Sequence, residues 1–215
     1  MKITYLGHSC FKLTSKNGTS VITDPYTKVG YELPSGLKAT AITVSHAHFD
    51  HNYTQAVQAE KVFSVLGTYQ IGDIEITGVH SWHDDKMGAL RGENIIFKFL
   101  IDGVTVCHLG DLGENITQEL IDKIGETDVL LLPVGGTYTI DGAQAKELSK
   151  RVSPKIAIPM HFKGDGKLDI SEISVFLEQF SPSVVQKEKD GEVEISKETL
   201  PNSTRIIYLE RKKYD

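Results

Sequence analysis

No stretch of this sequence is apolar for long enough to cross a membrane as a helix. The longest apolar runs are about six residues, as at 129–134, whereas a membrane-spanning helix requires roughly 20. The N-terminal residues alternate between polar and apolar side chains and lack the apolar core of a secretory signal. We therefore expect a cytoplasmic protein that does not insert into a membrane.

The chain also lacks an excess of basic residues. Its 23 Lys and Arg residues are outnumbered by 29 Asp and Glu residues, so the formal net charge is −6 at pH 7. A protein that binds nucleic acid through its phosphates presents a basic face, yet the only basic run here is Arg211–Lys213. The composition therefore argues against a nucleic-acid partner.

Cysteine is scarce. The two cysteines, Cys10 and Cys107, lie in separate strand-like runs and form no metal-spaced pair, so we expect small buried side chains in a reducing compartment. Hydrophobic residues make up 40% and charged residues 24% of the 215 residues, as in an ordinary globular protein. No repeat, low-complexity tract or linker interrupts the chain, which predicts a single domain over residues 1–215.

Short β-type runs dominate the first hundred residues. Three Asn-Gly or Asp-Gly pairs lie between such runs, at 17–18, 102–103 and 190–191. These pairs supply the positive φ angles that a two-residue hairpin turn requires. The sequence therefore predicts an antiparallel hairpin at each of the three positions.

Helical patterns come later in the chain. One helix is predicted over 117–124, ending at Gly125. A second is capped by Asp141, with Gln144 in the capping-box position, and a third by Ser171.

Apolar strands alternate with these helices, at 128–133 and 155–160. Strands of this kind are usually buried on both faces. Hairpin-rich strands followed by strands that alternate with helices predict sheets that pack together and carry helices outside. The fold class is therefore expected to be α/β or α+β.

One segment concentrates potential metal ligands. It reads Thr-Val-Ser-His-Ala-His-Phe-Asp-His from Thr43 to His51 and follows an apolar strand. In extended backbone His46 and His48 point to the same side, so both imidazoles can reach one cation. Asp50 and His51 follow where the chain should turn, and they can aim at a second position nearby. Two metals roughly 3.5–4 Å apart form a site that activates water for hydrolysis.

Two further strands end in potential ligands. Asp111 follows Gly110 at the end of the apolar run 104–109, and its carboxylate could bridge two cations. His161 follows the apolar strand 155–160 in the same way. Active-site side chains of layered α/β proteins favour such carboxyl ends of strands. Three separate strands therefore deliver ligands to one predicted rim.

These features resemble the metallo-β-lactamase superfamily, specifically its short bacterial branch of predicted metal-dependent (Zn) hydrolases, distantly similar to the ascorbate-6-phosphate lactonases. The likeness covers nearly the whole chain. It rests on the segments 6–9, 22–25, 46–51, 83–84, 91–94, 108–113, 133–136 and 158–161. The resemblance implies a four-layer αββα sandwich of two mixed β-sheets with outer helices, and a metal site at one edge between the sheets.

The resemblance also implies a ligand set. One metal is held by two histidines of the segment 46–51, called the long motif below, and by a third histidine. A carboxylate and two histidines hold the second metal, and one aspartate bridges the two metals. The corresponding residues are His46 and His48 for the first metal, Asp50, His51 and His161 for the second, and Asp111 as the bridge.

Two histidines compete for the place of the third ligand. His80 and His83 both lie in the segment 78–85. The family pattern puts the ligand directly before an acidic residue and upstream of Gly-x-x-Arg-Gly-x-Asn, which is matched here by 88–94 and favours His83. His80 is then a neighbour or a substrate contact.

Other polar residues have softer assignments. Asp24 is expected either to orient a ligating imidazole through its other nitrogen or to form an ordinary Asp-Pro turn. His8 is expected to line the pocket or to be a satisfied buried histidine, and His108 to be structural. Candidate substrate contacts, each with a surface or packing role as the alternative, are Arg91, Asn94, Tyr138 and Lys163.

The chemistry implied is hydrolysis by a metal-bound hydroxide, with Asp50 and Asp111 as catalytic carboxylates. A metal lowers the pKa of bound water from 15.7 to roughly 7. Two divalent ions and a bridging hydroxide beside these two carboxylates leave one positive charge, which favours an anionic or carbonyl-bearing small-molecule substrate. Imidazole and carboxylate ligands suit Zn²⁺, while Mn²⁺, Fe²⁺ and Ni²⁺ are also compatible.

The leading hypothesis is a dinuclear metal-dependent hydrolase of a small ester, lactone, amide or phosphoester. The alternatives are an RNA or phosphodiester nuclease of the same fold and a non-catalytic metal-binding sensor module. The sequence specifies neither the substrate nor the oligomeric state.

Overall fold

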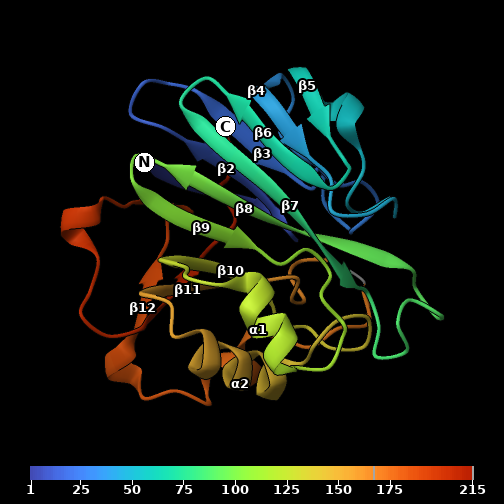
Figure 1. The fold of residues 1–215 in the computed structure, drawn as a ribbon, viewed down its shortest axis with the longest axis vertical. Helices are drawn as coiled ribbons and strands as arrows, with labels where there is room; N and C mark the ends of the chain where they lie inside the picture. The colour runs from blue at the N-terminus through green and yellow to red at the C-terminus, as the bar shows by residue number, and fades with distance from the viewer. Residues whose placement is uncertain (167, 215) are drawn as a thin grey trace.

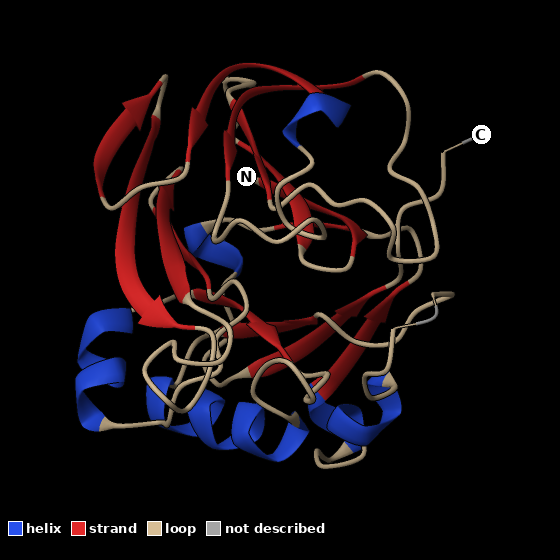
Figure 2. Cartoon of the chain, turned by 90° about the vertical axis from the view of Figure 1, so that its right-hand side faces the viewer, coloured by secondary structure: helices blue, strands red, loops and turns tan. Residues whose placement is uncertain are grey.

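Two β-sheets face each other, and the α-helices lie against one of them (Figures 1 and 2). The computed structural model describes residues 1–166 and 168–214. The first sheet has the strand order β13-β1-β2-β3-β4-β5. Its strands are β1 (Lys2–Gly7), β2 (Cys10–Thr14), β3 (Ser20–Thr23), β4 (Leu37–Thr43), β5 (Val57–Phe63) and β13 (Glu192–Glu194).

The second sheet has the order β12-β14-β11-β10-β9-β8-β7-β6. It consists of β6 (Gly67–Ile71), β7 (Ile74–Trp82), β8 (Glu93–Ile101), β9 (Val104–His108), β10 (Val129–Pro133), β11 (Ile156–Met160), β12 (Val185–Glu188) and β14 (Arg205–Leu209). Both sheets are mixed, because β3, β4 and β5 run parallel in the first sheet and β9, β10, β11, β14 and β12 in the second. The predicted α/β or α+β class with two mixed sheets packed together is confirmed; of the expected αββα layers, the described residues form the two sheets and one outer layer of α-helices, on the second sheet.

The helices of the described residues begin and end largely where local chemistry predicts. In α1 (Gln118–Ile124) the side chain of Thr117 accepts a hydrogen bond from the Leu120 amide, and Gly125 closes the helix with φ 63°. In α2 (Gly142–Val152) Asp141 and Gln144 form the predicted capping box. Each cap satisfies amide groups that have no partner within the helix.

The third predicted helix is shorter and starts later than the pattern indicated. The helix α3 covers only Ile173–Leu177, and its N-cap is Glu172 rather than Ser171. The amide of Ser171 instead donates to the carbonyl of Gly135, and its carbonyl accepts from Lys163. Because these two contacts commit Ser171 to extended backbone, the helix cannot begin there. Short 3₁₀ turns complete the described helical structure at Thr54–Ala56, Pro182–Val184 and Lys197–Thr199.

Two of the three predicted hairpins form, and the third does not. β2 pairs antiparallel with β3 around 17–18, and β8 with β9 around 102–103. The strands that flank 190–191 instead enter different sheets: β12 pairs with β14, and β13 with β1. The Gly191 carbonyl accepts from the Tyr5 amide of β1. The turn therefore passes the chain from one sheet to the other.

The core fills the space between the sheets and beneath the helices. The predicted apolar strands β10 and β11 are buried along their whole length, as expected for strands covered on both faces. Cys10 and Cys107 are buried free thiols. None of the helices in the described residues has the length and apolarity needed to span a bilayer, and the cytoplasmic location stays a prediction.

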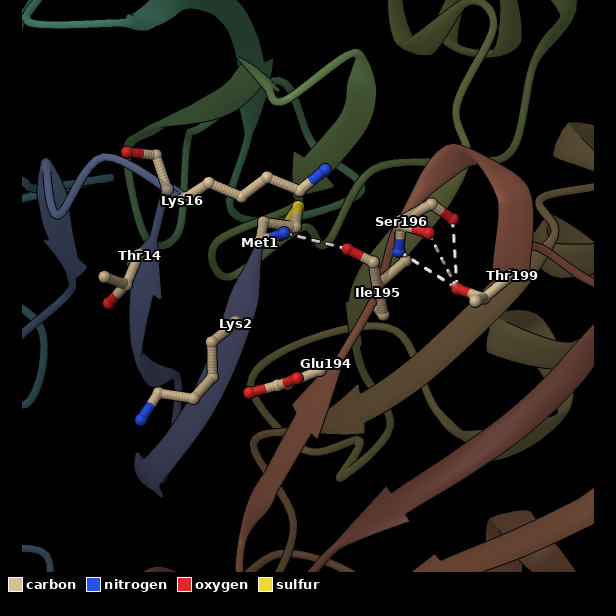
Figure 3. A pocket seen from close by; sticks show the side chains of 9 residues that line it. Met1, Lys2, Thr14, Lys16, Glu194, Ile195, Ser196 and Thr199 are labelled. Carbon is tan, nitrogen blue, oxygen red and sulfur yellow. Dashed lines mark hydrogen bonds between the residues drawn. The ribbon is translucent and has the colours of Figure 1, made fainter.

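The N-terminal amino group joins the two sheets. The Met1 ammonium donates to the Ile195 carbonyl at 2.9 Å, as Figure 3 shows, and lies 3.0 Å from the carboxylate of Asp102 in the β8–β9 turn. Ser196 and Thr199 are hydrogen-bonded beside it, on the wall of a surface pocket. This ion pair between the buried Met1 ammonium and the partly exposed Asp102 holds the start of β1 in position, and β1 ends at the candidate site.

Candidate metal centre

The candidate ligands lie beyond the carboxyl ends of strands from both sheets. Residues 46–51 follow β4 of the first sheet. His83 follows β7, Asp111 follows β9 and His161 follows β11, all in the second sheet. The structure therefore brings side chains from distant parts of the chain to one rim between the sheets, where the sequence predicted them.

Three groups of side chains have ligand atoms that lie within 4.8 Å of one another. One group contains the first two histidines of the long motif and the third histidine, a second surrounds Asp50, and a third includes Asp111. Their members are His46, His48 and His83; His8, Asp50, His51 and His161; and His46, His51 and Asp111.

Asp111 lies between the first two groups. Its Oδ2 is 3.2 Å from Nε2 of His83 and 3.3 Å from Nε2 of His161. Its Oδ1 is 3.2 Å from Nε2 of His51, and Nε2 of His46 lies 3.8 Å from Oδ2. The carboxylate thus faces imidazoles of both groups, as a bridging ligand would.

His83 rather than His80 joins the cluster. The His80 side chain extends from β7 toward the exposed Glu93, with 3.7 Å between Nε2 and Oε1, and packs edge-on against Trp82. The carboxylate of Asp84, next to His83, accepts hydrogen bonds from four backbone amides, those of Lys86, Gly88, Leu90 and Arg91. These bonds fix the loop after β7 and hold the pKa of Asp84 below its usual value against the opposing effect of burial.

Asp24 forms a hydrogen bond with His51, one of the candidate ligands. Its Oδ2 accepts from Nδ1 of His51 at 2.9 Å and from the Ser45 hydroxyl at 2.5 Å, and its Oδ1 accepts from the Ser45 amide at 2.8 Å. Burial alone would raise the pKa of Asp24, but the hydrogen bond from His51 and nearby histidines lower it. An ionised Asp24 therefore fixes the ring of His51, which is how a carboxylate orients a metal-bound imidazole.

Asn94 holds the turn that carries Asp111. This fully buried side chain accepts from the Asp111 amide at 3.0 Å and donates to the Leu109 carbonyl at 2.9 Å and to the Ser81 hydroxyl at 2.7 Å. All of these bonds point into the protein, so Asn94 supports the site from within and does not face a substrate. Gly110 is required between these residues, because a Cβ there would lie 2.3 Å from Oδ1 of Asn94.

His108 is structural, in the place where the sequence put it. Its Nε2 lies 2.8 Å from the Ser9 carbonyl, and its Nδ1 accepts from the Gly110 amide at 3.2 Å. These partners assign the proton of the neutral ring to Nε2. Burial is the main reason why the pKa of His108 is lowered.

The donor atoms are those of a cation site. Among the described residues, Nε2 of His46, Nε2 of His51 and Oδ1 of Asp111 are buried without a hydrogen-bond partner. Buried polar atoms are nearly always paired, whereas imidazole nitrogens and carboxylate oxygens are the atoms by which proteins bind Zn²⁺ and similar ions. The residues present therefore fit a divalent metal.

Comparison with known proteins agrees with this geometry. The family model described as the β-lactamase superfamily domain matches residues 2–161, a span that contains all the candidate ligands. The chain belongs to this superfamily. A UPF0173 metal-dependent hydrolase from Archaeoglobus fulgidus is 31% identical over 194 residues, which cover 75% of this chain and 83% of that protein.

Solved structures of other proteins have the same fold. A Thermotoga maritima protein classed as a Zn-dependent hydrolase of the metallo-β-lactamase superfamily is 34% identical, with a TM-score of 0.79 over 96% of this chain and 97% of that chain. Igni18, a metallo hydrolase from Ignicoccus hospitalis, is 23% identical, with a TM-score of 0.60 over 75% of this chain and 82% of that chain. The predicted superfamily and enzyme class, a hydrolase, are confirmed; the distant similarity to ascorbate-6-phosphate lactonases stays a prediction.

In this superfamily member burial favours the neutral, metal-binding form of His8, His46 and His48. Burial and the neighbouring His51 lower the pKa of His46 to about 3, and burial and His161 lower that of His8 to about 4. His51 differs: burial would lower its pKa, but the carboxylates of Asp111 and Asp24 raise it. Histidine contacts outweigh burial at Asp50 and Asp111, so both pKa values lie below the usual range.

A pocket of about 470 Å³ opens onto the cluster. It is lined by Ala47, His48, Phe49, Asp50, His83, Arg91, Asp111, Tyr138, His161 and Leu168. The Arg91 guanidinium lies 4.7 Å from the centre of the Tyr138 ring and 3.4 Å from the Thr137 carbonyl. Two of the four candidate substrate contacts, Arg91 and Tyr138, therefore reach the pocket.

The other two candidate substrate contacts, Asn94 and Lys163, do not line the pocket. Three residues that do line it were not predicted from the sequence. Lys163 pairs with Glu172 at 4.0 Å and is not in the described pocket wall. Phe49 lies inside the ligand motif, and the sequence could have indicated it as a pocket residue because it is apolar and stands between ligands. Its side chain is 53% exposed in the structure. Ala47 lies in the same motif, and Leu168 carried no such signal, because only the fold brings the loop after β11 to the pocket.

Proposed function

We propose that this chain is a dinuclear metal-dependent hydrolase. One ion would be held by His46, His48 and His83, a second by Asp50, His51 and His161, with Asp111 shared. The observation that carries this proposal is the position of Asp111, whose carboxylate lies 3.2–3.8 Å from imidazole nitrogens of both groups. Its Oδ1 has no hydrogen-bond partner among the described residues, which supports the same assignment.

Bound divalent ions would polarise the scissile bond and make a water molecule nucleophilic at neutral pH. Zn²⁺ suits the donor set best, and Mn²⁺, Fe²⁺ and Ni²⁺ are compatible with it. The two catalytic carboxylates have separate tasks. Asp50 lines the pocket and is ionised, so it is placed to orient the attacking water, to accept the proton that this water loses and to pass it to the leaving group. Asp111 keeps the two groups of imidazoles in a fixed relation.

The substrate is a small molecule with an anionic or carbonyl-bearing group. The pocket has the volume of a small-molecule site. Arg91 supplies a positive charge at its wall, and the Tyr138 ring holds the guanidinium in place. Phe49 and Leu168 add apolar surface to the same wall. An ester, lactone, amide or phosphoester with an apolar portion fits these features.

Metal removal tests the proposal. Protein stripped with a chelator should lose hydrolysis of a panel of lactones, thioesters and phosphodiesters, and should regain it when Zn²⁺ is added back. Wild-type protein should bind two ions per chain in a metal analysis. Full activity in stripped protein, or a single ion per chain, would contradict the dinuclear assignment.

A pair of histidine variants tests the ligand assignment. His83→Ala should lower the metal content sharply because it removes a donor from the first group, whereas His80→Ala should leave it unchanged. The reverse result would show that the register of the loop after β7 has been misread.

A further inference from the structure

His8 is held in an unusual backbone conformation at the end of β1. Its φ angle is +53°, a left-handed region in which non-glycine residues are uncommon. Hydrogen bonds fix it there: its amide donates to the Tyr31 hydroxyl, and its carbonyl accepts from the Tyr5 hydroxyl and the His161 amide, each at 3.0 Å. These hydrogen bonds therefore hold a residue with a strained backbone in one position, which is characteristic of functional sites.

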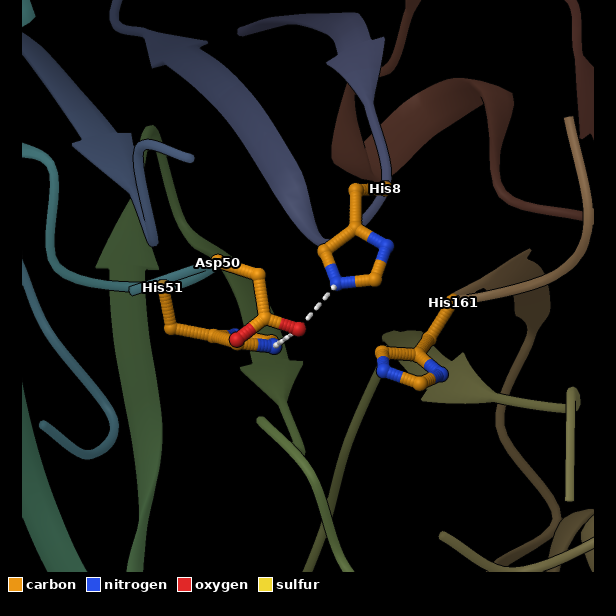
Figure 4. Close-up of side chains that lie close together, drawn as sticks. All are labelled: His8, Asp50, His51 and His161. Carbon is orange, nitrogen blue, oxygen red and sulfur yellow. Dashed lines mark ion pairs between the residues drawn. The ribbon is translucent and has the colours of Figure 1, made fainter. Parts of the chain in front are cut away.

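The same bonds aim the imidazole at the second group of candidate ligands. Figure 4 shows the His8 ring directed toward Asp50, with His51 and His161 close by. The ring centres of His8 and His161 are 4.3 Å apart, and those of His8 and His51 are 5.0 Å apart. One ligand atom from each of His8, Asp50, His51 and His161 lies within 4.8 Å of the other three.

The contact between His8 and Asp50 lacks the geometry of a hydrogen bond. Nε2 of His8 lies 3.3 Å from Oδ2 of Asp50, and the two atoms are not aligned as donor and acceptor. This buried nitrogen has no hydrogen-bond partner anywhere in residues 1–166 and 168–214. A satisfied packing histidine would not leave such an atom unpaired.

The spacing suits two ligands of one ion. Two donor atoms bonded to one Zn²⁺ at about 2.0–2.2 Å, with angles of about 90–120° between the bonds, lie roughly 2.8–3.8 Å apart. The separation of Nε2 of His8 from Oδ2 of Asp50 falls within that range. Nε2 of His51, which also has no partner among the described residues, lies 3.8 Å from the same oxygen.

We propose that His8 is a metal ligand. Its Nε2 would add a third imidazole to the second metal position, beside Asp50, His51, His161 and the shared Asp111, for a divalent cation such as Zn²⁺. The inference rests on the proposed function in one respect, since it requires the second metal position to exist. It assigns His8 to that position instead of to the protein core or to the substrate.

Titration with Co²⁺, followed by visible absorption, tests the assignment in solution. His8→Asn is the suitable variant, because asparagine tolerates positive φ while its short side chain cannot reach the Nε2 position. Loss of a supporting contact typically lowers metal affinity 10–100-fold, so loss of a direct ligand should weaken binding of the second Co²⁺ about 100-fold or more. Binding of the first Co²⁺ should stay unchanged, and the absorption bands of the second should shift. The control His80→Asn should match the wild type.

The outcomes separate the two proposals. If wild-type protein does not bind a second Co²⁺, the dinuclear assignment fails and the role of His8 fails with it. If the wild type binds two ions and His8→Asn binds both with unchanged affinity and spectrum, only the role of His8 is overturned. Should the variant not fold, as judged by near-ultraviolet circular dichroism, a crystal structure of the Zn²⁺-loaded wild type decides. It should place Nε2 of His8 about 2.0–2.2 Å from the ion, and a separation above about 3 Å would overturn the proposal.

Discussion

Oδ2 of Asp24 lies 2.9 Å from Nδ1 of His51, and both side chains are completely buried. Asp24 comes from the end of β3 and His51 from the loop after β4, two strands that run parallel in the first sheet. Because the neighbouring strands end at the same edge, the carboxylate reaches the imidazole from the side opposite its Nε2. The fold thereby presents Nε2 of His51 to the candidate metal position.

Replacing Asp24 by asparagine should weaken metal binding. In Asp24→Asn the amide cannot accept all the bonds that now come from His51, the Ser45 amide and the Ser45 hydroxyl, so the His51 ring loses its fixed orientation. We expect affinity for the second ion to fall about 10–100-fold, measured by competition with a chromophoric chelator. Asp73→Asn removes a carboxylate that accepts bonds from Ser15 and Asn17, away from the site, and should leave the affinity unaltered. Equal effects of the two variants would refute the orienting role.

Gly110→Ala should destabilise the protein more than a glycine replacement in an open turn. The added Cβ would lie 2.3 Å from Oδ1 of Asn94 and 2.7 Å from Cβ of Ser45, at φ +56°. Gly18→Ala shares the positive φ (+89°) but meets no atom within 4 Å, so it reports backbone strain alone. We expect the free energy of unfolding to drop by about 1 kcal/mol for Gly18→Ala and by at least about 2–3 kcal/mol for Gly110→Ala. Urea unfolding measures both, and similar losses would mean that the site relaxes around the extra carbon.

His108 should make metal-free protein less stable as the pH falls. Its pKa in the fold is lowered, mainly by burial, from the ordinary value of 6.5, so the unfolded chain binds more protons below that pH. The stabilising contribution of the neutral ring is therefore present above pH 6.5 and is lost as the pH falls through the lower folded pKa. Protonation of Nδ1 would also break the bond from the Gly110 amide.

A non-titrating variant isolates this effect. His108→Gln should lower the thermal midpoint of stripped protein most at pH 7.5, and the difference from wild type should shrink toward pH 5, because only the wild type loses the His108 contribution. His80→Gln serves as the control, since that ring is partly exposed. A difference that stays constant or grows with acidification would show that His108 is not held neutral by the fold.

Arg91 should bind the anionic group of a ligand. Inorganic phosphate is a suitable probe, with its affinity for Zn²⁺-loaded protein measured by calorimetry. A hydrogen bond to a charged group contributes about 1.5–3 kcal/mol, so Arg91→Ala should weaken phosphate binding at least about 10-fold. Lys163→Ala removes a positive charge from a residue paired with Glu172 outside the described pocket wall, and phosphate affinity should not change. If both variants bind phosphate like the wild type, the ions alone account for anion affinity.

Several features could be predicted from the sequence because they depend on atoms a few residues apart. The capping box of Asp141 and Gln144 and the turn at 102–103 involve only local backbone geometry. The segment from His46 to His51 contains so many potential ligands at close spacing that a cation site could be predicted there without knowledge of the rest of the fold. Asp111 and His161 were predictable as strand-end residues, since parallel strands present their carboxyl ends at one rim.

The remainder depended on contacts between distant segments. The pair at 190–191 has the local signature of a hairpin, yet β12 and β13 find better partners in β14 and β1. Ser171 is a residue type that often caps a helix, but its amide and carbonyl are hydrogen-bonded to the backbone of Gly135 and Lys163. His8 shows the same limit most clearly. Its sequence neighbourhood fits a packed histidine, and only the tertiary structure brings its unpaired nitrogen beside Asp50, because the fold locks the end of β1 onto the backbone of His161.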